Sequence, residues 1–301
     1  MASEELQVVR ELLRGSGLDR LTIPERRRAM ESFAASPPGG TAVDPVDAGG
    51  VPAEWVAAPG VSPGRVLLYL HGGAYQAGSP ATLRNLVALL SGATQARALS
   101  VDYRLAPEHP FPAAVEDALA AYRWLLASGI DPALIAVAGD SAGGGLALGA
   151  LVALRDAGEP MPAAAVLLSP WTDLALTGES LRTRAAVDVM IKPDGISEDA
   201  ALYLADADPR HPHASPLYAD LRGLPPLLIH VGDAEVILDD STRLAARASE
   251  AGVEVSLEIW DEMPHVFPAF AGWLPEADQA IEHIGAWLDQ RYPAARSPAG
   301  G

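Results

Sequence analysis

A single serine stands between two apolar runs, in a frame whose glycines limit how the surrounding chain can fold. Ser141 follows the strand-like run 134–138 and precedes the helix-like run 146–154. A chain that passes from strand to helix this quickly needs small residues two places before and two places after the serine, and Gly139 and Gly143 fill both places. The turn strains the serine backbone and sets the hydroxyl at a helix N-terminus, where peptide dipoles favour negative charge. The pattern predicts a nucleophile elbow; a glycine-rich turn before a buried helix is the plainer alternative.

A nucleophilic serine of this kind needs backbone donors earlier in the chain, and an acid and then a histidine after it. The apolar run 66–70 predicts a strand that ends at the sequence His-Gly-Gly-Ala, residues 71–74. Glycines let backbone N–H groups approach a reacting carbonyl oxygen, so we expect the amides of Gly72, Gly73 and Ala142 to form an oxyanion hole. The histidine of this sequence is expected to anchor the loop by hydrogen bonding; a plain turn at a strand end is the alternative.

The best candidate for the base is a histidine on a loop near the end of the chain. Residues 255–260 alternate as a strand, and the following loop carries His265. A neutral imidazole at this place would accept the serine proton, so activity should fall on the acid side with a single imidazole titration. The remaining histidines that we considered have simpler explanations on the surface or in packing: His109, His211, His213, His230 and His283.

The acid is less sharply defined, because one loop offers four carboxylates. The strand predicted at 227–231 leads into this loop, which carries Asp233, Glu235, Asp239 and Asp240. The last two resemble caps or first-turn acids of the helix predicted at 242–251. Asp233 and Glu235 therefore both remain candidates to orient the imidazole and to stabilise its cation.

Together these motifs resemble those of the bacterial hormone-sensitive-lipase-like carboxylesterases of the α/β-hydrolase fold. The resemblance covers most of the chain. It rests on His71-Gly72-Gly73, on Asp102-Tyr103-Arg104-Leu105-Ala106-Pro107-Glu108, on Phe111-Pro112-Ala113-Ala114, on Gly139-Asp140-Ser141-Ala142-Gly143-Gly144 and on Met263-Pro264-His265.

The resemblance implies a serine esterase that acts on carboxylic esters with short to medium acyl groups and needs no metal or organic cofactor. Counting back from the acidic pair at 239–240, the family position of the acid falls on Glu235, where aspartate is the commoner residue. A glutamate has a longer side chain, so Asp233 stays an alternative. Ala74 replaces the usual third glycine of the loop, which should narrow the space behind the substrate without removing an N–H group.

The order of apolar and amphipathic runs predicts a mostly parallel sheet flanked by helices. A chain of 301 residues suits one such domain, 1–301. Two segments are expected to form a helical cap over the carboxyl ends of the strands: about 1–40, with helical periodicity at 4–14 and 24–35, and about 173–214, which is too long for a simple connection. Pocket walls would come from this cap.

Composition excludes several classes of partner. The formal net charge of −18 and pI near 4.6 argue against nucleic acid or an anionic membrane, because their phosphates would repel this surface. The chain has no cysteine, so it forms no disulfide or thiolate metal site. Residues 1–5 are acidic where a signal peptide would be basic, and a cytoplasmic location is the default expectation. The resemblance allows a homodimer through edge strands.

Two other readings deserve comparison with ester hydrolysis. Asp206, Asp208, His211 and His213 could suggest a metal cluster, but a solvated loop broken by prolines explains them better. The glycines at 143–145 fail the spacing of a dinucleotide fingerprint, which argues against an oxidoreductase. A small-molecule receptor on a hydrolase fold is the remaining non-enzymatic alternative, and a histidine retained at the base position argues against it.

Overall fold

An eight-stranded sheet runs through the centre of the computed structural model, which describes residues 3–61 and 64–293. Its strand order is β1-β2-β4-β3-β5-β6-β7-β8, and every neighbouring pair from β4 to β8 is parallel, while β1 and β2 are antiparallel additions at one edge. The predicted, mostly parallel sheet is confirmed. The strands are β1 (Ala42–Asp47), β2 (Pro52–Ala57), β3 (Val66–Leu70), β4 (Arg97–Val101), β5 (Ile135–Asp140), β6 (Ala164–Leu168), β7 (Leu227–Gly232) and β8 (Val255–Trp260).

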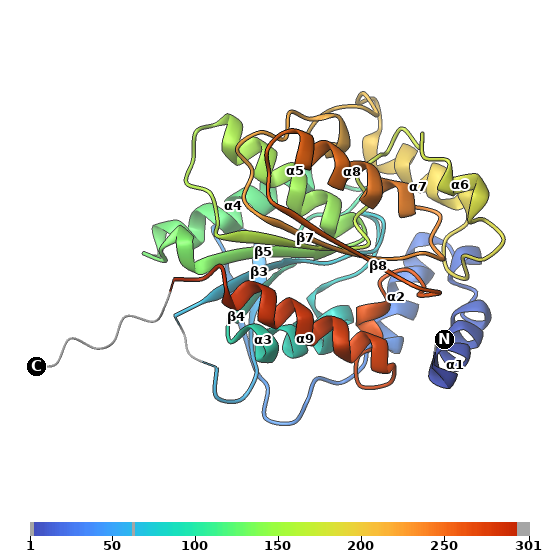
Figure 1. The fold of residues 1–301 in the computed structure, drawn as a ribbon, viewed down its shortest axis with the longest axis horizontal. Coiled ribbons are helices and arrows are strands. Elements are labelled where there is room, and N and C mark those ends of the chain that lie inside the picture. The colour runs from blue at the N-terminus through green and yellow to red at the C-terminus, as the bar shows by residue number, and fades with distance from the viewer. Residues whose placement is uncertain (1–2, 62–63, 294–301) are drawn as a thin grey trace, which may run out of the picture.

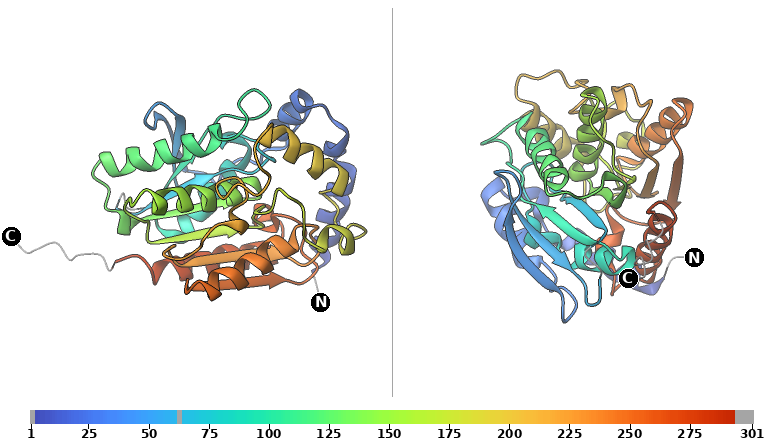
Figure 2. Two further views of the ribbon diagram at one scale, coloured as in Figure 1. Left: turned by 90° about the horizontal axis from the view of Figure 1, so that it is seen from above. Right: turned by 90° about the vertical axis from the view of Figure 1, so that its left-hand side faces the viewer.

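Helices cover both faces of this sheet. Figure 1 shows α4, α5 and α8 on one face and α3 and α9 on the other, and Figure 2 shows these layers from two further directions. Side chains of β3 alternate between two cores: Leu68 and Leu70 pack with the first set of helices, Leu67 and Tyr69 with the second. These helices are α3 (Arg84–Thr94), α4 (Ala113–Ala127), α5 (Ala142–Asp156), α8 (Leu238–Glu250) and α9 (Pro275–Asp289).

The parallel register decides which loops meet. Leu70, the last residue of β3, pairs with Gly139 near the end of β5, so the His-Gly-Gly-Ala loop leaves the sheet beside the turn that carries Ser141. β6 and β7 follow on the other side of β5, and their loops open at the same edge. Because carboxyl ends of adjacent parallel strands lie together, this edge collects the motifs found in the sequence.

The helices outside these two layers lie together at one end of the molecule (Figure 1). Arg26 on α2 contacts Asp199 on α7 at 3.1 Å, and the Asp199 carbonyl accepts a hydrogen bond from Gln76 Nε2 at 3.0 Å. The two segments expected to form a cap therefore contact each other. These helices are α1 (Glu4–Gly15), α2 (Ile23–Phe33), α6 (Ser180–Thr183) and α7 (Pro193–Leu204); short 3₁₀ turns span Leu18–Arg20, Pro80–Leu83, Pro132–Leu134, Pro216–Tyr218 and Phe267–Phe270.

Two helices begin earlier than the sequence pattern predicts. α5 starts at Ala142 rather than near 146. Its glycines have low helix propensity, which is why the sequence pattern places the start too late. They let the helix pack closely on the loop after β6, since a Cβ on Gly145 would overlap the Trp171 carbonyl. α8 starts at Leu238 rather than 242, so the acidic pair at 239–240 lies inside its first turn and does not cap it. Within the described part of the chain, no helix has the length and apolar character needed to cross a membrane.

Candidate active site

Ser141 occupies the turn between β5 and α5, in the strained conformation that the motif predicts. Its backbone has φ 52° and ψ −121°, outside the regions that non-glycine residues normally adopt. The two small neighbours are required by the packing: a Cβ on Gly139 would overlap the carbonyl of Gly143, and one on Gly143 would overlap the carbonyl of Leu70. The turn holds the serine at the N-terminus of α5, with its side chain partly exposed.

Ser141, His265 and Glu235 form one chain of hydrogen bonds. His265 Nε2 lies 2.8 Å from Ser141 Oγ, and His265 Nδ1 lies 2.7 Å from Glu235 Oε2. Because an ionised carboxylate only accepts, Nδ1 donates to Glu235 and a neutral ring leaves Nε2 free to accept the serine proton. His265 is 4% exposed and Glu235 is fully buried. The structure thus brings together three residues that lie far apart in the sequence.

The second oxygen of Glu235 is also fixed. Oε1 accepts hydrogen bonds from Ser169 Oγ at 2.7 Å and from the Gly232 amide at 2.6 Å. Ser169 Oγ in turn accepts the amide of Val266 at 3.0 Å, so one hydroxyl links the acid to the loop of the histidine. Every oxygen of the carboxylate therefore has a partner, and its orientation toward the imidazole is set by the surrounding backbone.

The alternative acid points elsewhere. Asp233 Oδ1 accepts the backbone N–H of Glu262 at 2.7 Å and so closes the turn after β8. Among the described residues, the only carboxylate within hydrogen-bonding distance of His265 is that of Glu235. Geometry therefore separates two candidates that spacing alone left open.

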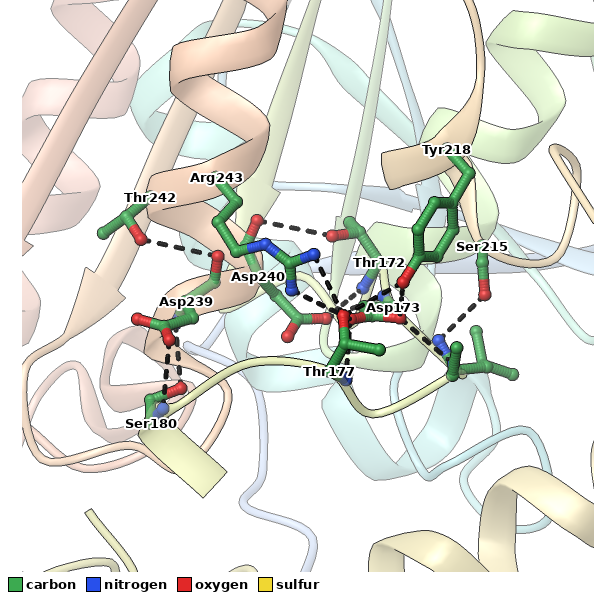
Figure 3. A network of polar contacts seen from close by, with 12 residues as sticks. Thr172, Asp173, Thr177, Ser180, Ser215, Tyr218, Asp239, Asp240, Thr242 and Arg243 are labelled. Atoms are coloured by element: carbon green, nitrogen blue, oxygen red, sulfur yellow. Dashed lines mark hydrogen bonds and ion pairs between the residues drawn. The ribbon is translucent and has the colours of Figure 1, made fainter. Parts of the chain in front are cut away.

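The acidic pair of α8 braces the loop that follows β6 (Figure 3). Asp240 is buried, and its Oδ2 accepts the amides of Thr172 and Asp173 at 2.7 and 2.8 Å. Burial raises the pKa of Asp240 to about 8 despite these two bonds. Arg243 pairs with Asp173 at 2.9 Å beside it. Both acids lie in the first turn of α8, which is one of the two expected positions, but they do not cap the helix, because their carboxylates contact the preceding loops.

The expected donor role of Gly72 needs correction. Its N–H donates to Asp140 Oδ1 at 2.9 Å, and a Cβ on Gly72 would overlap Oδ2 of the same carboxylate. Among the described residues, no acceptor is found for the N–H groups of Gly73, Ala74 or Ala142. The loop lies at the carboxyl end of β3, and its amides without an acceptor begin one residue later than Gly72.

The histidine of this loop is a structural anchor, as expected. His71 is buried, its Nδ1 donates to the Gly72 carbonyl at 2.7 Å, and its ring stacks on Tyr103 with centroids 4.2 Å apart. Burial lowers the pKa of His71 to about 4, so the ring stays neutral near neutral pH. Tyr103 Oη donates to the His71 carbonyl at 2.6 Å, and the amide of Ala106 donates to the Tyr75 carbonyl at 2.8 Å. The conspicuous run at 102–108 therefore braces the loop.

Opposing effects act on the protonation of His265. Burial lowers the pKa of His265, but the charge and hydrogen bond of Glu235, together with the charges of Asp188 and Asp140, outweigh it, so the pKa lies above its usual value. Asp140 shares this environment, and its burial raises its own pKa to about 6, although Tyr69 and Gly72 donate to it. The site thus favours the imidazolium ion that proton transfer from a serine would create.

The other histidines lie away from Ser141 and have their own contacts. His230, buried in β7, lies 3.2 Å from Glu258, and His283 on α9 lies 3.3 Å from the same carboxylate. The amide of His213 donates to His211 Nδ1 at 3.2 Å within an irregular loop. In the described residues, no group of three or more His, Asp or Glu side chains is arranged to hold a metal ion.

Sequence reasoning gave no role to three polar residues that contact the site: Asp140, Ser169 and Asp188. A signal existed for Ser169, because it follows the buried strand β6 directly and so lies at the carboxyl edge of the sheet. Asp140 stood within the serine motif, but its bond to Gly72 spans 68 residues. Asp188 is one acid among many in the polar segment 173–214, and nothing in its neighbours distinguished it.

Comparisons with known proteins agree with this geometry. A profile of the α/β hydrolase fold matches residues 67–269. An acetyl-hydrolase of Streptomyces hygroscopicus is 50% identical over 295 residues, which are 96% of this chain and 97% of that protein. The solved structure of an esterase from the bacterial hormone-sensitive lipase family is 49% identical, with a TM-score of 0.95 over 97% of this chain and 100% of that one. The structure of EstE5 soaked with p-nitrophenyl butyrate is also 49% identical, with a TM-score of 0.93 and the same coverage.

Proposed function

This chain belongs to the hormone-sensitive-lipase-like esterases of the α/β-hydrolase family, and from that premise we propose that it hydrolyses carboxylic esters with short to medium acyl groups through an acyl intermediate on Ser141. Ester hydrolysis is the activity of the family. The observation that carries the assignment to residues is the pair of hydrogen bonds that joins Ser141 Oγ to His265 and His265 to Glu235. A small-molecule receptor would not need these three side chains to be hydrogen-bonded in a chain.

In the proposed mechanism, His265 Nε2 takes the proton of Ser141 as Oγ attacks the ester carbonyl. Glu235 holds the ring by Nδ1 and stabilises its positive charge. The imidazolium then gives its proton to the leaving alcohol as the carbon–oxygen bond of the tetrahedral intermediate breaks. Water, deprotonated by the same nitrogen, then attacks the carbonyl of the acyl enzyme. The second tetrahedral intermediate breaks its bond to Ser141 Oγ, which takes the proton back from Nε2, and the carboxylic acid is released.

The negative oxygen of both tetrahedral intermediates requires donors that are not already used. We assign this role to the amides of Gly73, Ala74 and Ala142, because the Gly72 amide is donated to Asp140. Ala74 has φ 55° and Gly73 has φ 116°, and these conformations turn the loop sharply away from β3. Preorganised amides of this kind stabilise charge only where it develops, so they lower the barrier and not just the energy of the bound ester.

A cap built from about 1–40 and about 173–214 would cover this site and limit the acyl group. Two observations support it: Tyr203 on α7 stacks on Tyr75 with ring centroids 3.6 Å apart, and Arg27 on α2 donates to the carbonyl of Gln76 at 2.7 Å. Both parts of the cap therefore contact the residues just after the oxyanion loop. A cytoplasmic location and a homodimer stay predictions from the sequence and the resemblance.

A panel of p-nitrophenyl esters tests the function. We expect turnover that is highest for short and medium acyl chains, such as acetate to hexanoate, and low for long chains, because the acyl group must fit between the cap and the loop at 73–76. The measurement is kcat/KM for each chain length, with and without a phosphonate directed at serine. Equal rates for all chain lengths would contradict the enclosed acyl site, and full activity after phosphonate treatment would contradict the serine mechanism.

The pH dependence follows from His265 and Asp140. His265 must be neutral to act as base, so kcat/KM should fall as the pH drops through the raised pKa of His265. Asp140 takes up a proton near pH 6 and then holds the Gly72 amide less firmly. The slope of log kcat/KM against pH should therefore steepen from one toward two below about pH 6, rather than follow a single titration.

The variant Asp140→Asn provides the control for this profile, since it keeps an oxygen for Gly72 and removes the second titration. Its acid slope should stay at one. A wild-type slope of one throughout would show that Asp140 does not affect the rate in this range.

A further inference from the structure

Val236, the residue that follows Glu235, is held through both its backbone N–H and its carbonyl by side chains of the segment 173–214. The N–H of Val236 donates to Asp188 Oδ2 at 2.8 Å, and its carbonyl accepts Ser180 Oγ at 2.6 Å. Ser180 also joins Asp239, whose Oδ2 accepts its N–H at 3.0 Å (Figure 3). Both partners of Val236 therefore come from outside the strand β7 and the loop that follows it. The backbone beside the acid therefore depends on a segment about 50 residues earlier in the chain.

Asp188 is held in this position by backbone donors. Its side chain is buried, with 3% of the residue exposed, and its Oδ1 accepts the amides of Met190 and Ile191 at 2.8 and 2.9 Å. Three backbone N–H groups thus bind one carboxylate, which is a strong arrangement for an anion. Lys192 Nζ donates to the backbone carbonyl of Asp188, and among the described ion pairs none includes the Asp188 carboxylate. Its charge is stabilised by dipoles and is not cancelled by a cation.

The groups that face His265 are three carboxylates from three elements and one hydroxyl. Glu235 comes from the loop after β7, Asp140 from the end of β5, and Asp188 from the segment before α7, while Ser141 lies on the opposite nitrogen. Of the three carboxylates, only that of Glu235 forms a hydrogen bond with the ring. Asp188 acts on the ring at longer range and on Glu235 through Val236.

We propose that Asp188 is a positioning residue for the acid: it fixes the backbone after Glu235 by its bond to Val236, and it adds a further negative charge that stabilises the His265 imidazolium. The proposal rests on the proposed function. It makes docking of the segment 173–214 a condition for fast turnover, because the same segment that would cover the ester also holds the acid in place. A purely structural role would stabilise the fold and leave the titration of the base unchanged.

The test is Asp188→Asn in the full-length protein with p-nitrophenyl butyrate as substrate. We expect kcat to fall about tenfold with KM within about twofold, since the substitution removes the charge and sets an amide NH2 group against a backbone N–H that a carboxylate oxygen accepted, while the ester contacts stay. The acid limb should also move to lower pH by about half a unit, because loss of a nearby negative charge lowers the pKa of His265. The direction of this shift is decisive, because His265 stays neutral to lower pH in the variant while the rate on the pH plateau drops.

The matched control is Glu54→Gln, the same carboxylate-to-amide change at a buried acid on β2, whose partner is Arg84 at 2.7 Å. It should lower the melting temperature and keep the wild-type acid limb. Asp188→Asn that loses only melting temperature, with wild-type kcat and acid limb, overturns the proposal. An inactive wild type that no phosphonate labels would instead contradict the proposed function.

Ser180→Ala decides the matter if Asp188→Asn does not fold. It removes the hydroxyl that donates to the Val236 carbonyl and leaves the Asp188 charge in place. The proposal then requires a several-fold loss of kcat with an unchanged acid limb, roughly the effect of one hydrogen bond. Wild-type kcat in Ser180→Ala would show that the segment does not position the acid.

Discussion

Ser141→Ala should reduce kcat for ester hydrolysis by about 10⁴-fold or more, the effect expected when a nucleophile is removed from a serine triad. Any residual rate would come from the amides of Gly73, Ala74 and Ala142 acting on an ester attacked directly by water. The measurement is kcat for p-nitrophenyl butyrate, together with mass spectrometry of the protein after treatment with a phosphonate. The wild type should gain one adduct on Ser141, and the variant none.

Folding of this variant provides its control. The Ser141 side chain is partly exposed, and within residues 3–61 and 64–293 its hydroxyl hydrogen-bonds only to His265, so its removal leaves no cavity in the core. Loss of the one hydrogen bond between Ser141 and His265 should leave the melting temperature within a few degrees of the wild type. A phosphonate adduct on another serine of the wild type, or substantial turnover in Ser141→Ala, would contradict the assignment of the nucleophile.

Glu235→Gln should lower kcat by roughly 10²- to 10⁴-fold, as loss of the triad carboxylate does in serine hydrolases. The amide has the shape of the carboxylate, but it can present N–H to His265 Nδ1 and so favour the wrong tautomer, with the proton on Nε2. The change also removes a charge that stabilises the imidazolium and forces Ser169 Oγ and the Gly232 amide to share an uncharged acceptor. kcat and melting temperature should be measured together.

Asp233→Asn is the matched control, because it makes the same chemical change two residues away in the same loop. Asp233 accepts the Glu262 amide and does not contact His265, and an asparagine oxygen can accept the same bond. We expect kcat within a few-fold of the wild type. The reverse order, with Asp233→Asn inactive and Glu235→Gln near the wild type, would overturn the choice of acid.

Local chemistry made much of the fold predictable. The limits expected for Val66–Leu70 and Val255–Trp260 match the structure, because these segments have apolar patterns bounded by glycine or a charged turn. For α5, the sequence pattern predicted too late a start. Its first residues are glycines that no propensity places in a helix, and only the close approach of the Trp171 backbone requires them there.

The site divides in the same way between sequence and tertiary structure. Ser141 and its elbow could be deduced from five consecutive residues, because the steric demands of a strand-to-helix turn are local, and His265 and the oxyanion loop follow from their places at strand ends. The direction of side chains on loops is not local. Whether Glu235 or Asp233 meets His265, whether the Gly72 amide is available, and what holds the acid all depend on contacts such as Gly72 to Asp140 and Val236 to Asp188, which join residues 68 and 48 positions apart. The sequence by itself therefore determined which chemistry this chain carries, and only the packing of distant segments decided which carboxylate contacts His265 and which amide of the loop after β3 is bound to Asp140.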